Sequence, residues 1–211
     1  MAKHNNMSQA EKITAWVLTG ASASLTAVVV WWTWGRPEQF LERIGFTEDV
    51  WQMPIVWVAA IIIALAYIAY AAWAVPAVRK NLFKMSRLKA IGIWAAIVSG
   101  IVEEVVFRHL LMDGLQSAGA GVGLQITISA LAFGVAHAAW VGLSGKWKTT
   151  VYTVISTVAL GALLAGLYIL ADRSAVPAIA AHIIINLGIE PWLVLGVVSG
   201  GKHGVGKAAQ K

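Results

Sequence analysis

Long apolar stretches follow one another along the chain, with only short polar segments between them. A helix needs about 20 consecutive apolar residues to cross a hydrocarbon core about 30 Å thick. Six stretches predict membrane-spanning helices, at residues 13–34, 50–78, 90–112, 121–143, 151–171 and 175–198. The first continues as far as Trp34, which is long for the apolar part of a signal peptide, so we expect a membrane helix there.

This pattern predicts an all-α fold, a polytopic transmembrane helix bundle of about six spans. No soluble module interrupts the apolar stretches, so we expect residues 1–211 to form a single membrane domain, with a Gly/Lys-rich, disordered tail at 200–211. The segment 35–49 mixes charged and apolar residues. It suits a short amphipathic helix on the membrane surface and a plain solvated connector equally well.

Basic residues are distributed unequally between the predicted loops. One set of alternate segments carries Lys3, Lys12, Arg79, Lys80, Lys84, Arg87, Lys89, Lys146, Lys148, Lys202, Lys207 and Lys211. The opposite set carries only Arg36, Arg43 and Arg173. Cytoplasmic loops carry the excess of lysine and arginine. We therefore expect both termini in the cytoplasm and a multi-pass protein of the bacterial inner membrane.

The composition agrees with a protein whose solvent is lipid. The 211 residues are 59% hydrophobic and 12% charged, against about 25% charged in soluble domains. The net charge of +6 does not call for nucleic acid as a partner, because lysines beside a membrane face anionic headgroups. The absence of cysteine excludes disulfides and a cysteine nucleophile.

Three predicted spans contain polar side chains at bilayer depth, where a charge costs about 2.5–3.5 kcal/mol on insertion scales. In the third span, Glu104 and Arg108 are four residues apart and can pair on one helix face. Glu103 points about 100° away from that face. It has no partner within its own helix, and a free buried carboxylate suits a general base.

The fourth span carries Phe133 and His137 on one face, and the sixth carries His182 and Asn186 on one face. Each polar residue alone is commonly a hydrogen-bonding contact between membrane helices. Together they are costly unless they meet in a hydrated cavity. By helical rise, Glu103 lies about 20 Å from the inner end of its span and His137 only about 9 Å from its own. They can meet only if helices tilt, break or begin elsewhere.

These residues form three strings: EExxxR at 103–108, FxxxH at 133–137 and HxxxN at 182–186. In this order they resemble the CPBP family, the CAAX-protease and bacteriocin-processing (Abi) membrane proteins, which includes the Ras-converting type of CAAX prenyl endopeptidase. The resemblance covers the family's core helices, roughly 97–187, and places the motif-bearing core at about 90–198. Many family members have eight spans, so the accessory helices differ.

The resemblance implies a glutamate-dependent intramembrane endopeptidase without a metal or another cofactor. Glu103 would be the base, with His137 beside it holding the water, and His182 with Asn186 would form the oxyanion site. We expect Glu104 and Arg108 to orient and support them. A substrate would be a peptide or protein at the membrane. Most bacteria lack prenylated cysteines, which favours maturation or clearance of a membrane-bound peptide over a CAAX target.

Three other functions compete with this interpretation. Glu103, His137 and His182 are possible ligands of a catalytic zinc, although HExxH is absent and no two of them share a helix. The string GxSG at 142–145 makes Ser144 a candidate nucleophile, but the predicted topology places it about 20 Å from His182, beyond the ~2.6–3.2 Å that a nucleophile and its base require. A non-catalytic scaffold, transporter or immunity protein is the third, because intramembrane Glu and His also form proton relays.

Overall fold

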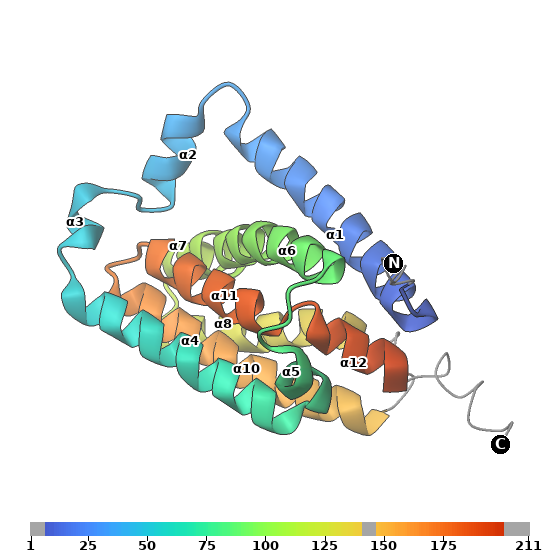
Figure 1. The fold of residues 1–211 in the computed structure, drawn as a ribbon. Coiled ribbons are helices and arrows are strands. Elements are labelled where there is room, and N and C mark those ends of the chain that lie inside the picture. Colours follow the sequence, from blue (N-terminus) through green and yellow to red (C-terminus); the bar gives the residue numbers. More distant parts are fainter. Residues whose placement is uncertain (1–6, 141–146, 201–211) are drawn as a thin grey trace, which may run out of the picture.

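The computed structural model describes residues 7–140 and 147–200, which fold into helices and turns without a β-strand (Figure 1). The elements in chain order are α1 (Gln9–Thr33), α2 (Pro37–Arg43), α3 (Glu48–Trp51), α4 (Pro54–Ala74), α5 (Pro76–Asn81), α6 (Arg87–Glu104), η1 (Val105–Met112), α7 (Asp113–Ser117), α8 (Val122–His137), η2 (Ala138–Trp140), α10 (Trp147–Leu170), α11 (Val176–Ile189) and α12 (Trp192–Gly200). The predicted all-α bundle is confirmed.

Within the described residues, four helices are long and apolar enough to cross a membrane: Gln9–Thr33, Pro54–Ala74, Arg87–Ser117 and Val151–Leu170. The pair α11 and α12 adds a fifth if it is counted as one span bent by 50°. The remaining apolar helix, α8, has only 16 residues. The chain is thus a multi-pass membrane protein, while six spans and the side of the termini stay predictions.

Prolines explain where the observed helices differ from the predicted spans. The stretch predicted at 50–78 is divided, because α4 begins at Pro54 and a new helix, α5, begins at Pro76. The last span is divided at Pro191, between α11 and α12. Proline has no N–H to continue the hydrogen-bond ladder, but it is well tolerated in the first turn of a helix.

The segment 35–49 contains two short helices, α2 and α3, in place of a single amphipathic one. Two of its apolar side chains face the bundle: Ile44 is 5% exposed, and the Phe40 ring stacks on Trp32 at 6.1 Å, whereas Leu41 and Phe46 are exposed. Its charged residues, such as Glu42, are exposed. This two-sided character agrees with the amphipathic interpretation.

The longest rod in the molecule is formed by α6, η1 and α7, which run as one 31-residue helix from Arg87 to Ser117. At the α-helical rise this is about 46 Å, longer than the hydrocarbon core. The middle part, η1, is a π-helix of eight residues that begins directly after Glu104. Such wide turns are rare and occur often at functional sites.

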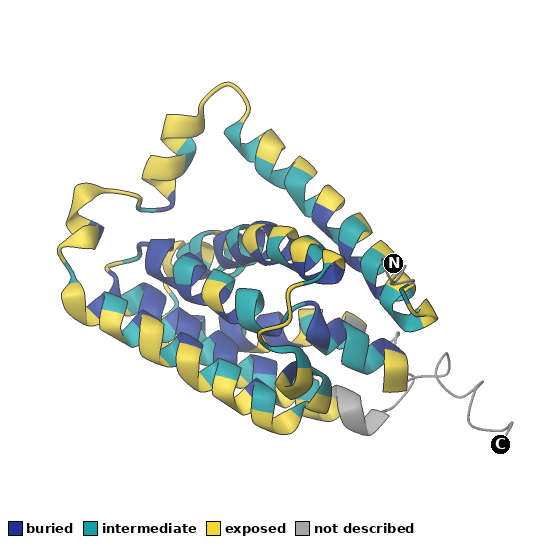
Figure 2. Cartoon of the chain, viewed as in Figure 1, coloured by how far each residue is buried: buried dark blue, intermediate teal, exposed yellow. Residues whose placement is uncertain are grey.

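The centre of the bundle is α11, which packs between α4, α6 and α10. Ala178, Ala181 and Ile185 on this helix are fully buried. On α4, by contrast, Ile62 and Leu65 are about as exposed as surface residues, at 60% and 59%. Figure 2 shows the exposed positions along the outer faces of α1 and α4. Apolar residues on an outer face suit contact with lipid chains, as expected for a membrane bundle.

Close contact between α6 and α11 depends on Gly100. A Cβ atom at this position would lie 2.6 Å from Cγ1 of Ile183, which is shorter than a real van der Waals contact. Small residues let the backbones of membrane helices approach each other closely. This approach places the last turn of α6 beside the middle of α11.

The observed helix ends explain how Glu103 and His137 can meet although their predicted depths in the membrane differ. The span predicted at 121–143 is shorter in the structure, because α8 ends at His137 and continues as a 3-10 turn. Glu103 lies well inside the long rod, which is longer than the membrane is thick. The helices therefore begin and end elsewhere than the hydropathy pattern predicts.

Candidate active site

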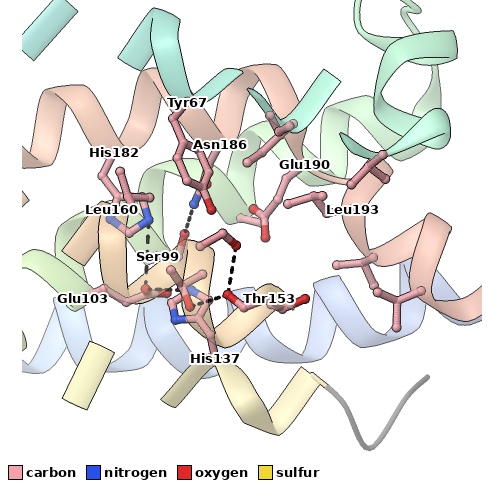
Figure 3. A pocket seen from close by; sticks show the side chains of 18 of the residues that line it. Tyr67, Ser99, Glu103, His137, Thr153, Leu160, His182, Asn186, Glu190 and Leu193 are labelled. Carbon is pink, nitrogen blue, oxygen red and sulfur yellow. Dashed lines mark hydrogen bonds and ion pairs between the residues drawn. The ribbon is translucent and has the colours of Figure 1, made fainter. Parts of the chain in front are cut away.

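Three helices bring the predicted polar residues together. Glu103 and Glu104 stand at the end of α6, His137 at the end of α8, and His182 and Asn186 on successive turns of α11. Figure 3 shows Glu103 between the two imidazole rings, with Asn186 on the neighbouring turn. Glu103, Phe133, His137, His182 and Asn186 thus line one cavity, whereas Glu104 and Arg108 are fully buried and do not line it.

Glu103 faces both histidines. Its Oε2 atom lies 3.6 Å from Nε2 of His137 and 4.0 Å from Nε2 of His182. Its side chain is 24% exposed, and Oε2 has no hydrogen-bond partner among the described residues. Glu103 is therefore a carboxylate of the cavity wall that lies beside both imidazoles without a close partner on Oε2.

Glu104 is fully buried and belongs to a different network. It forms an ion pair with Arg108, with Nε at 2.9 Å from Oε2. Its Oε1 is 2.8 Å from Nδ1 of His182, and Arg108 donates to the Ser129 hydroxyl at 2.8 Å. A carboxylate paired with arginine is an acceptor, so Nδ1 of His182 carries the proton in this bond. The second ring nitrogen is left to face Glu103.

The Phe133 ring packs against both imidazole rings. Its ring centroid is 4.5 Å from that of His137 and 5.7 Å from that of His182. The guanidinium of Arg108 lies 5.1 Å from the same ring. His137 is also fixed by a 2.9 Å contact between its Nδ1 and the Phe133 carbonyl. Since a carbonyl only accepts, Nδ1 carries the proton and Nε2 presents a lone pair to Glu103.

Two serines in the site were not selected from the sequence. Ser99 accepts a hydrogen bond from the Asn186 amide at 3.2 Å, and Ser129 joins Arg108 to the Phe107 carbonyl. Ser99 is four residues before Glu103 and therefore on the same helix face, a signal that the spacing offers. Ser129 likewise lies four residues before Phe133 on one face of α8, but spacing within α8 does not indicate its partners Arg108 and Phe107 on η1.

The cavity itself has a volume of about 620 Å³. Its walls come from α1, α4, α6, α8, α10, α11 and α12, and most of the lining side chains are apolar. The polar lining residues besides the predicted ones are Ser22, Tyr67, Tyr70, Ser99, Tyr152, Thr153, Ser156, Thr157 and Glu190. A mostly apolar pocket with a few convergent polar groups is typical of a ligand site.

A second polar cluster lies at the far end of the long rod. Asp113 accepts hydrogen bonds from Tyr168 at 2.8 and 2.9 Å and pairs with His109 at 2.9 Å and with Arg173. Arg173 also donates to Gln125. No role was predicted for these residues from the sequence. Their contacts join α7, α8 and the end of α10, and none of them lines the large cavity.

The structure gives no support to the two rival catalytic sites, the zinc site and the serine nucleophile, in the residues that it describes. Within residues 7–140 and 147–200, no group of three His, Asp or Glu side chains has an arrangement that fits a metal ion. Ser144 lies outside the described residues, so the serine-protease interpretation stays a prediction.

The fold and the cluster together define a helical membrane protein with a carboxylate–imidazole site inside its bundle. Residues 85–188 match the model of a known family, described as type II CAAX prenyl endopeptidase Rce1-like. This part of the chain belongs to that family of CAAX membrane proteases, which confirms the resemblance of the three motifs. Neither a curated protein nor a solved structure matches the chain.

Proposed function

We propose that the chain is an intramembrane endopeptidase that hydrolyses a peptide bond in a membrane-associated peptide or protein, using water activated by Glu103 and His137. The observation that carries the proposal is the contrast between adjacent carboxylates. Glu104 is fully buried and pairs with Arg108 at 2.9 Å and with His182 at 2.8 Å, whereas Glu103 is partly exposed to a cavity and lies 3.6 and 4.0 Å from two imidazoles. A protease of this class would reside in the bacterial inner membrane.

The first step is deprotonation of water. Oε2 of Glu103 and Nε2 of His137 are 3.6 Å apart, which leaves room for a water that donates one hydrogen to each. The oxygen lone pair of that water then faces the cavity and attacks the scissile carbonyl carbon. Glu103 takes the proton and returns it to the leaving amine. General base catalysis of this kind contributes about 10²–10⁴-fold.

The oxyanion of the tetrahedral intermediate needs donors on the other side of the carbonyl. Nε2 of His182, when protonated, is one donor, and the Asn186 amide is the second. With His182 protonated, the two positive charges of Arg108 and His182 would balance the two negative charges of Glu103 and Glu104. Losing one oxyanion donor typically costs about 2.7–4 kcal/mol in the barrier.

The substitution Glu103→Gln tests the proposal, because it keeps the shape and removes the base. The full chain, in detergent or liposomes, would be assayed against quenched-fluorescent peptides that contain an apolar segment. We expect cleavage to fall by about 10²–10⁴-fold, with the helical signal and melting temperature unchanged. The matched control is Glu42→Gln on the exposed face of α2, which should cleave normally. Wild-type cleavage by Glu103→Gln would overturn the proposal.

A further inference from the structure

A second carboxylate lines the cavity and has no role in the mechanism above. Glu190 follows α11 directly, one helical turn after Asn186, and belongs to the cavity wall. Figure 3 shows it beside Asn186, with its carboxylate directed toward the space between the helices. Its Oε2 atom is buried and has no hydrogen-bond partner among the described residues.

Lys89 on α6 does not pair with this carboxylate. Its Nζ atom donates instead to the Leu187 carbonyl. Within the described part of the chain, no salt bridge involves Glu190. An unpaired polar group at a buried position is costly, and the cost is removed when a partner arrives.

The rest of this wall is apolar. Glu190 is followed in the lining by Leu193, Val194 and Val197 on α12, and Ala71 and Val75 also belong to the lining. Glu190 and Glu103 line the same cavity, and two carboxylates in one low-dielectric site repel each other. An occupant that brings one positive charge on an otherwise apolar segment would relieve both carboxylates and fill the remaining wall.

We propose that Glu190 determines substrate specificity, by pairing with a lysine or arginine side chain near the scissile bond of an otherwise apolar peptide. The inference rests on the proposed protease function. Its structural basis is the juxtaposition of an unpartnered buried carboxylate, the apolar wall of α12 and the catalytic glutamate in one cavity. A residue in this role acts on substrate selection and not on the water.

The test compares peptides that differ at one position, with Lys, Met or Glu at each site flanking the scissile bond. For the full chain in liposomes we expect kcat/KM to favour the Lys peptide. Glu190→Gln should lower kcat/KM for that peptide by about 30-fold or more, the effect of removing one partner of a buried charge pair. It should leave the Met peptide nearly unchanged. Glu190→Lys should shift the preference to the Glu peptide, and Glu190→Asp should retain the preference for Lys.

Binding separates this inference from the proposed function. The affinity of the labelled Lys and Met peptides would be measured by fluorescence anisotropy for Glu103→Gln and for the double variant Glu103→Gln/Glu190→Gln. Tighter binding of the Lys peptide that disappears only in the double variant supports Glu190, whether or not cleavage occurs. Equal binding of both peptides to Glu103→Gln, or an equal loss for both peptides in Glu190→Gln, would overturn the role of Glu190 and leave that of Glu103 standing.

Discussion

At the scale of single residues, neighbouring positions in this chain do different work because their surroundings differ. The side chain of Glu104 is 0% exposed and that of Glu103 is 24% exposed. Glu104 is held by a guanidinium and an imidazole, whereas Glu103 has only long contacts to two imidazoles. The first belongs to the framework that holds the site, and the second faces the cavity.

This difference predicts that the same substitution lowers the free energy of unfolding by different amounts at the two positions. Glu104→Ala leaves Arg108 buried without its partner, and breaking a buried pair in this way costs about 3–5 kcal/mol. Glu103→Ala removes a partly exposed side chain without a close partner and should change the free energy of unfolding by well under half as much. Chemical unfolding in detergent, followed by circular dichroism, measures both. Equal destabilisation would show that the two glutamates are not distinguished in this way.

Ser99 is expected to act through Asn186. Ser99→Ala removes the acceptor that holds the Asn186 amide, and a hydrogen bond of this kind contributes about 0.5–1.5 kcal/mol. Cleavage should therefore fall by a factor of about 2–12, with KM nearly constant. Asn186→Ala should have a larger effect of about 10²–10³ in kcat. A greater loss for Ser99→Ala than for Asn186→Ala would contradict this order.

Helix spacing predicted the Glu104–Arg108 pair and the shared faces of Phe133 with His137 and of His182 with Asn186. It did not predict that Glu104 also accepts from His182, because periodicity within one helix contains no information about the register between two helices. For the same reason no role could be predicted for Glu190, which lies at the bend between α11 and α12.

At the scale of elements, the site depends on how closely α6 and α11 approach. Hydropathy located the helices of the bundle but not all of their ends. The break at Pro191 and the end of α8 at His137 both lie inside apolar stretches. Apolar composition does not change at such a break. The π-helical part of the rod also has no counterpart in the hydrophobic pattern.

Gly100→Ala tests the close approach. Its Cβ would lie 2.6 Å from Cγ1 of Ile183, so the helices must shift, and overpacking of this kind costs about 1–3 kcal/mol. Gly166→Ala on α10 is the control, because no atom lies within 4 Å of the added Cβ. It should stabilise the helix by about 0.5–1 kcal/mol. Unfolding in detergent measures both, and a stabilised Gly100→Ala would disprove the contact.

At the scale of the whole molecule, apolar helices of membrane-spanning length are arranged around a central helix, and charged loops lie at their ends. The class of fold and the family followed from the sequence, because hydropathy and three motifs depend on local order alone. The predicted number of spans stays a prediction, since α8 is short and α11 with α12 is bent.

Orientation in the membrane can be measured directly, because the natural chain contains no cysteine. Glu42 on α2 and Lys84 after α5 are both exposed and lie beyond opposite ends of α4 (Figure 1). The positive-inside rule places the loop of Lys84 in the cytoplasm. A membrane-impermeant thiol reagent added to whole cells should label Glu42→Cys, and should label Lys84→Cys only after the membrane is opened. Labelling of both from outside would show that α4 does not cross.

The π-helical segment η1 has a consequence for how the chain tolerates length changes. It lies between the last turn of α6, which carries Glu103, and Asp113, which is bound by Tyr168 and Arg173 at the other end of the rod. Each residue added or removed in a helix rotates everything beyond it by about 100°. A deletion within Val105–Met112 can be compensated when a wide π turn narrows to an α turn, whereas a one-residue insertion would put these two ends of the rod out of phase, so that only one could keep its partners.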